Sequence, residues 1–249
     1  MSKLLYKLKP QSGLSAFLHV ALNALLPVIV FILIRLDLVL IAAVMVFLAK
    51  WRTLAVKPRY WVSNIRANLV DIFIGLSAVA FIAGTSTWYI QVIWTLLYMV
   101  WLVWLKQQSK PISVMVQALA AQALALIAFY RTFPDTSILI GMIVVWLVCY
   151  AAARHFLSAF DEPLTGAITN IWAWFGAVMA WILGHWMIDY MFLPQIALII
   201  SILGYGMATL YYLHAKDKLD ASLKRQLIGV LLVLLLIIIV FSDWQDKTI

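Results

Sequence analysis

Residues 227–241 read LIGVLLVLLLIIIVF, a stretch of fifteen residues without a charged or strongly polar side chain. A helix needs about 20 mostly apolar residues to cross the hydrocarbon core of a bilayer, and about 17 are still enough. Because the ends of a segment predicted from sequence are uncertain by several residues, this stretch predicts a membrane-spanning helix. The absence of polar groups indicates that this helix faces lipid.

Eight further segments of the chain show the same apolar character. The nine predicted spans are Leu14–Ile34, Leu38–Val56, Ala67–Ile82, Trp88–Leu105, Ile112–Tyr130, Ser137–Ala153, Thr165–Trp186, Leu193–Leu213 and Leu227–Phe241. In Leu38–Val56 the uninterrupted apolar part, Leu38–Ala49, is too short to span the bilayer by itself. The whole segment spans only if Lys50 and Arg52 extend their side chains to the membrane surface. If this segment does not cross, eight spans remain. The sequence therefore predicts an all-α fold, a polytopic integral membrane helix bundle.

Composition supports this class of protein. Apolar residues make up 66% of the 249 residues and charged residues only 11%, against about 25% charged residues in soluble domains. These values exclude a soluble enzyme and a disordered chain. We expect one transmembrane domain over residues 14–242, with short tails at residues 1–13 and 243–249.

The basic residues predict an orientation. With the N-terminus inside, 15 of the 18 lysines and arginines fall in cytoplasmic segments, and only Arg35, Arg131 and Lys247 fall outside. Short cytoplasmic loops of membrane proteins carry such an excess. We therefore expect a cell-membrane protein with a cytoplasmic N-terminus and an external C-terminus. Its basic side would contact anionic lipid headgroups, and no nucleic-acid partner is expected.

Polar residues recur on single faces of several predicted helices. Gln117 and Gln122 share a stripe with Ala118, Ala121, Ala125 and Ala128, and His19 and Asn23 share a face of the first helix. In lipid, such faces turn toward protein or water. Because the odd-numbered helices start inside, their polar residues predict a layer in the cytoplasmic half of the bundle. The candidate substrate- or ion-binding residues are Asp71, His19, Asn23, Gln117, Gln122 and Asn170.

Asp71 is the one acidic residue clearly inside a predicted span, and two interpretations remain open. It could bind a proton or cation in a cavity that opens inward. It could instead pair with Arg66 or Arg59 near the interface, or interact favourably with the helix N-terminus.

One short motif resembles a known enzyme family. The sequence His19-Val20-Ala21-Leu22-Asn23 resembles the His-x-x-x-Asn motif of rhomboid intramembrane proteases, in which a serine nucleophile acts with a histidine base. The other candidate residues, Ser86 and His185, would lie on the external side, away from His19. We therefore reject this resemblance and expect no enzyme activity. The sequence indicates no catalytic residue, no cofactor and no metal site.

Two functions fit these features. The first is a nucleotide-independent transporter or permease-like protein for a small solute, ion or lipid, because no Walker A sequence is present. The alternative is a non-catalytic structural or accessory subunit in which the polar residues only join helices. A protein with either function could bind a membrane protein partner or form a homo-oligomer.

Overall fold

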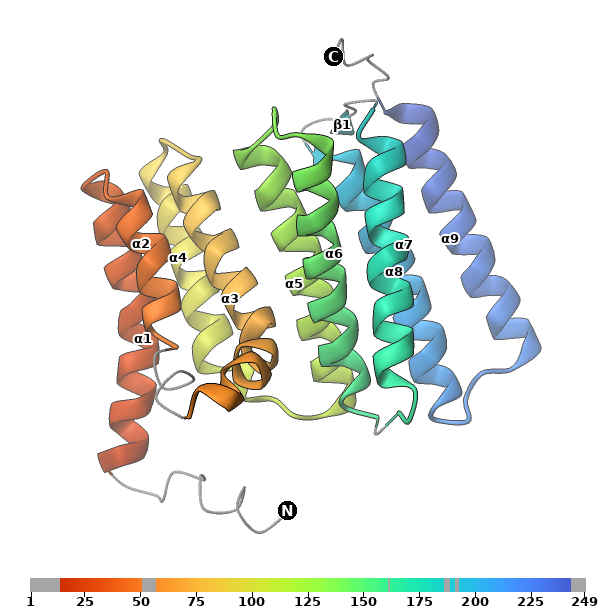
Figure 1. Cartoon of the computed structure of the whole chain (residues 1–249), viewed down its shortest axis with the longest axis horizontal. Coiled ribbons are helices and arrows are strands. Elements are labelled where there is room, and N and C mark those ends of the chain that lie inside the picture. The colour runs from red at the N-terminus through yellow and green to blue at the C-terminus, as the bar shows by residue number, and fades with distance from the viewer. Residues whose placement is uncertain (1–13, 51–56, 161, 186–188, 191–192, 243–249) are drawn as a thin grey trace.

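The computed structural model describes residues 14–50, 57–160, 162–185, 189–190 and 193–242, and most of these residues are helical (Figure 1). The predicted tails, residues 1–13 and 243–249, lie outside this part. In chain order the helices are α1 (Leu14–Arg35), α2 (Val39–Leu48), α3 (Trp61–Ala83), α4 (Trp88–Val103), α5 (Pro111–Thr132), α6 (Ile138–Leu157), α7 (Thr165–Leu183), α8 (Gln195–His214) and α9 (Ala221–Phe241). The 3₁₀ helices η3 (Pro58–Tyr60) and η4 (Leu105–Gln107) precede α3 and follow α4, and strands β1 (Asp189–Tyr190) and β2 (Leu193–Pro194) pair antiparallel before α8.

Seven helices, α3 to α9, with α4 continued by η4 to Gln107, are long and apolar enough to cross a membrane by length and composition. The apolar part of α1 whose side chains are described, Val20–Arg35, is shorter, and so is α2. The ten residues of α2 extend about 15 Å at about 1.5 Å per residue, roughly half of a hydrocarbon core. The end of the predicted span Leu38–Val56 lies outside the described residues. The all-helical membrane bundle is confirmed, and the count of nine spans stays a prediction.

Two helices begin earlier than the apolar pattern predicts. Helix α3 begins at Trp61 instead of Ala67, and α9 begins at Ala221 instead of Leu227. The added turn of α9 is polar, and Asp220 caps it by accepting a hydrogen bond from Leu223 N at 2.6 Å. Hydropathy missed both turns because it detects the part of a helix that suits lipid, not the polar turn that precedes it.

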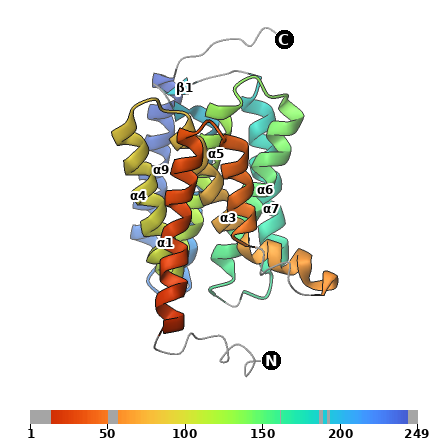
Figure 2. The same ribbon diagram turned by 90° about the vertical axis from the view of Figure 1, so that its left-hand side faces the viewer.

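The start of α3, together with η3, projects sideways from the bundle (Figure 2). Tyr60 and Trp61 are exposed there, and the Arg59 guanidinium lies 4.6 Å from the centre of the Tyr60 ring. Exposed aromatic and basic side chains together are typical of a segment that lies in a membrane interface.

The helices alternate in direction, so α1, α3, α5, α7 and α9 all begin at one end of the bundle (Figure 1). We call this end the basic end. Of the 13 described lysines and arginines, 11 lie at or toward it, and Arg35 and Arg131 lie at the opposite end. The 11 are Lys50, Lys57, Arg59, Arg66, Lys106, Lys110, Arg154, Lys216, Lys218, Lys224 and Arg225. That this end is cytoplasmic stays a prediction.

The buried apolar residues form two main clusters along the bundle. One joins α1 to α4 and includes Val30, Val46 and Ile82, and the other joins α5 to α8 and includes Leu126 and Ile200. Contacts of α3 with α5 and α6 connect the two groups, whereas α9 packs mainly on α8. Only Ile238 of α9 is buried, which agrees with its predicted lipid-facing position.

Replacing Gly75 with alanine is expected to destabilise the α2–α3–α4 junction. A Cβ there would lie 2.5 Å from Val46 Cγ1 and 2.7 Å from Tyr98 Oη, and both neighbours are buried. Such overpacking typically costs about 1–3 kcal/mol. Denaturant unfolding in detergent micelles measures it. The matched control is Gly166→Ala, where a Cβ meets no atom within 4 Å. Wild-type stability of the Gly75 variant would contradict the close packing of α2 on α3.

Candidate functional site

Asp71 lies in a cluster of charged side chains near the basic end. Its Oδ2 is 2.9 Å from Lys50 Nζ and 2.8 Å from Lys106 Nζ. Trp101 Nε1 donates a hydrogen bond to the other carboxylate oxygen at 3.3 Å. The side chains of Asp71 and Lys50 are only 13% and 12% exposed, and that of Lys106 is 32% exposed. The cluster thus joins α3 to the residues that follow α2 and α4.

The arginines expected to pair with Asp71 lie elsewhere, so that part of the sequence interpretation is wrong. The Arg66 guanidinium lies 5.8 Å from the centre of the Tyr150 ring on α6, and Arg59 lies over Tyr60. The physical reason for Arg59 is its place in η3, because this segment projects sideways from the bundle with the start of α3 (Figure 2).

The charges of this cluster favour a helix-joining role. One carboxylate and two ammonium groups carry a formal net charge of +1, so the cluster attracts an anion more readily than a cation. Both carboxylate oxygens already accept hydrogen bonds or ion pairs from protein groups. A proton- or cation-binding role for Asp71 stays a prediction without support from this geometry.

Gln117 forms a second polar network at the basic end. Its Nε2 donates to the carbonyl oxygens of Leu105 at 2.5 Å and Gln108 at 3.0 Å, and its Oε1 lies 2.9 Å from His155 Nε2. Because Leu105 and Lys106 are both in η4, this short helix connects the Gln117 network to the Asp71 cluster. The network holds η4, α5 and α6 together.

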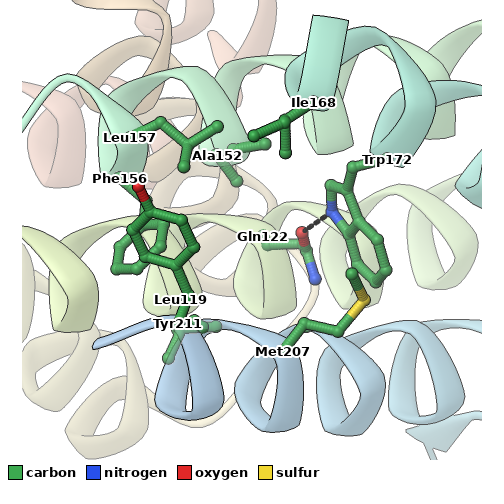
Figure 3. Close-up of a pocket in the computed structure, with 13 residues that line it drawn as sticks. Leu119, Gln122, Ala152, Phe156, Leu157, Ile168, Trp172, Met207 and Tyr211 are labelled. Atoms are coloured by element: carbon green, nitrogen blue, oxygen red, sulfur yellow. Dashed lines mark hydrogen bonds between the residues drawn. The ribbon is translucent and has the colours of Figure 1, made fainter. Parts of the chain in front are cut away.

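Gln122 joins three helices deeper in the bundle (Figure 3). Its Nε2 donates to the Ile200 carbonyl oxygen at 3.1 Å, and its Oε1 accepts a hydrogen bond from Trp172 Nε1 at 3.0 Å. The side chain is 2% exposed. The amide of α5 therefore makes bonds to both α7 and α8, as expected for a polar group inside a helical membrane bundle.

A largely apolar cavity lies beside the Gln122–Trp172 pair, and we call it the lateral pocket. It holds about 550 Å³, counted out to its open mouth. Its lining comes from α5, α6, α7 and α8 (Figure 3): Ala118, Leu119, Gln122, Ala152, Ala153, Phe156, Leu157, Ile168, Trp172, Gly204, Met207, Ala208 and Tyr211.

The lining of the lateral pocket reaches both the apolar face and the basic end of the bundle. Helix α7 packs mainly on α6 and α8 mainly on α5, which leaves a slot between α7 and α8 where Met207 is 53% exposed. Toward the basic end, the Tyr211 hydroxyl donates to the Glu162 carboxylate. This bond holds the pKa of Glu162 below its ordinary value. The pocket therefore combines an apolar interior with a polar rim.

The remaining predicted site residues are not brought to this pocket. Asn170 is exposed, and its Nδ2 bonds the Gly166 carbonyl oxygen of its own helix at 2.8 Å. Asn23 is half-buried on α1, in the other helix group. His19 lies in α1, and its side chain is outside the described part. The structure thus separates the predicted polar layer into the Asp71 cluster, the Gln117 network and the Gln122 bonds.

Sequence reasoning missed several partners in these networks. Lys106 and His155 stand at helix ends among other polar residues, and Trp172 is one of the 12 tryptophans of the chain. The spacing of residues along one helix indicates which of them face inward. It does not indicate which residue of another helix lies opposite. No protein-family model, curated protein or solved structure matches this chain, so the candidate site is defined by its own geometry alone.

Proposed function

We propose that this protein is a nucleotide-independent transporter or permease-like protein whose cargo is a lipid-like amphiphile. The observation that carries the proposal is the lateral pocket, an apolar cavity with one hydrogen-bonded polar pair, Gln122–Trp172, in its wall. Among the small solute, ion and lipid classes expected from the sequence, an apolar lining supports the lipid class.

The pocket has to select its cargo by polar contacts. A hydrocarbon chain that enters from the bilayer is already in an apolar medium, so it gains packing contacts but little hydrophobic free energy. The Gln122–Trp172 pair and the Tyr211–Glu162 rim are therefore the groups that would recognise a polar part of the cargo. An anionic headgroup would also be favoured by the lysines and arginines of the basic end, at about 1 kcal/mol per nearby basic residue.

A second candidate function is a structural or accessory subunit. The observation that favours it is the bonding of Asp71, Gln117 and Gln122, each of which joins helices through protein groups. This function needs no cargo, so the two candidates differ in whether a lipid occupies the lateral pocket and crosses the bilayer.

The test is photolabelling in reconstituted vesicles with a phospholipid that carries a diazirine near the end of one acyl chain. Ile168→Trp adds bulk to the pocket wall, and Ile171→Trp adds the same bulk on the exposed face of α7, where Ile171 is 70% exposed. We expect labelling of α5–α8 peptides, relative to lipid-facing α9, to fall several-fold in Ile168→Trp and to persist in Ile171→Trp.

Transport is measured on the same vesicles with a fluorescent phospholipid and a membrane-impermeant quencher. We expect faster transbilayer movement with the wild type and Ile171→Trp than with Ile168→Trp or empty vesicles. Equal labelling in both variants argues against the lateral pocket as the binding site. Specific labelling without lipid movement would instead support the accessory function.

A further inference from the structure

Residues 57–66 form a basic and aromatic surface at the edge of the bundle, and we call them the interface segment. They comprise η3, the residue before it and the first six residues of α3. Figure 2 shows this part of the chain at the basic end, where it projects across the direction of the neighbouring helices. Because those helices cross the bilayer, a segment with this direction runs along the membrane surface.

The apolar side chains of the interface segment share one face of the helix. Trp61, Val62 and Ile65 are 41%, 67% and 39% exposed. With 3.6 residues per turn, these three fall within about 100° of one another around the helix axis, whereas Ser63 falls toward the opposite side. The buried residues of α3 begin only at Val70. The start of α3 is therefore an amphipathic turn whose apolar face is largely exposed.

The interface segment is also positively charged. Its basic residues Lys57, Arg59 and Arg66 are all exposed. None of the three forms an ion pair with another residue in the described part of the chain. The sequence has no acidic residue between Asp37 and Asp71, so the segment itself supplies no counter-charge. Three positive charges therefore remain beside an exposed apolar face.

We infer that the interface segment binds the headgroups of anionic phospholipids, with Trp61, Val62 and Ile65 in the adjoining acyl-chain region. A helix with basic and apolar residues on neighbouring faces binds a membrane surface in this way. A guanidinium can donate two parallel hydrogen bonds to a phosphate. Each basic residue near the membrane surface strengthens the binding of anionic lipid about fivefold.

A second copy of the chain fits this surface less well than lipid does. In a two-fold symmetric dimer the same surface patch of both subunits meets, which would bring six positive charges together without a carboxylate between them.

This binding surface is separate from the site of the proposed function. The lateral pocket is lined by α5–α8, whereas the interface segment belongs to η3 and the start of α3. The lipid bound here stays at the membrane surface and is not a cargo. Headgroup binding thus does not depend on transport through the lateral pocket, and either result can fail alone.

The experiment places a bimane fluorophore on the interface segment of the full chain through Val62→Cys. The one native cysteine, Cys149, is buried, and the chain without the new cysteine measures background labelling. The labelled protein is reconstituted in phosphatidylcholine vesicles with a minor fraction of brominated phosphatidylcholine or brominated phosphatidylglycerol, whose bromine atoms quench nearby bimane. We expect the anionic brominated lipid to quench at least about fivefold more strongly than the neutral one. Aqueous iodide is expected to quench little.

Matched double variants, made in the Val62→Cys chain, remove the same charge at two places of the basic end. Arg59→Gln with Arg66→Gln is expected to lower the preference for the anionic lipid several-fold. Lys216→Gln with Lys218→Gln, in the exposed loop between α8 and α9, should leave the preference unchanged. Arg59→Lys with Arg66→Lys keeps both charges and should retain most of it.

Four results would overturn the inference. Equal quenching by the two brominated lipids would mean that the segment does not select anionic headgroups, and an equal loss in the two glutamine variants would mean that the whole basic end does. Quenching by iodide instead of bromine would place the segment in water. Protection from both quenchers would mean that protein, such as a second copy of the chain, covers it.

Discussion

Replacing Asp71 with asparagine is expected to lower the free energy of unfolding by about 3–5 kcal/mol, the usual cost of removing one partner from a buried ion pair. The reason is the pair of ammonium groups that remains. Lys50 Nζ and Lys106 Nζ both lie within 3 Å of Asp71 Oδ2, so asparagine would leave two cations facing one another without the carboxylate that pairs with both. Equilibrium unfolding of the purified protein in detergent micelles measures the loss.

The matched control is Asp135→Asn, the same change in an exposed acid of the α5–α6 loop, which is expected to shift stability by less than about 0.5 kcal/mol. Removing Lys50 in the Asp71→Asn background should restore much of the loss. Removing Lys106 should restore less, because its side chain is 32% exposed and can reach water. Equal stability of Asp71→Asn and wild type would mean that the cluster is already well solvated.

The positions of the helices could be predicted from sequence because a membrane helix is defined by properties of its own residues. Most predicted spans, such as Ile112–Tyr130, match the observed helices within a few residues. The exceptions are instructive. The start of α3 departs from the pattern because the interface accepts polar and aromatic residues. The short α2 departs from it because packing on α1 and α3, not length, holds this helix in place.

The inward face of α5 could also be predicted. All six residues of the glutamine and alanine stripe on α5 are buried, since polar and small side chains are expelled from the lipid-facing side of a helix. The assignment of Asn170 to the polar layer was not supported, because an amide can bond the carbonyl of its own preceding turn and remain exposed.

The partners of these residues could not be predicted. Which lysine reaches Asp71, or which indole reaches Gln122, depends on how helices far apart in the sequence are placed.

Replacing Gln122 with alanine is expected to have the next largest effect. The change removes the acceptor of Trp172 Nε1 and the bond to the Ile200 carbonyl oxygen. Trp172 is buried, so its N–H would be left unpaired at a cost of about 1–3 kcal/mol. Unfolding in detergent micelles measures the loss of stability. Trp172→Phe is expected to cost a similar amount, because it leaves the buried Gln122 Oε1 without its donor.

Because Gln122 is bonded to α8 near Gly204, substitutions at these two positions are expected to have coupled effects on stability. A Cβ on Gly204 would lie 2.5 Å from Gln122 Nε2, so Gly204→Ala should destabilise the wild type by about 1–3 kcal/mol through overpacking. In the Gln122→Ala background the same change meets a truncated side chain and should cost little. Residues in contact show such non-additivity, whereas distant sites do not. Additive effects of the two changes would place Gln122 away from α8 and remove it from the wall of the lateral pocket.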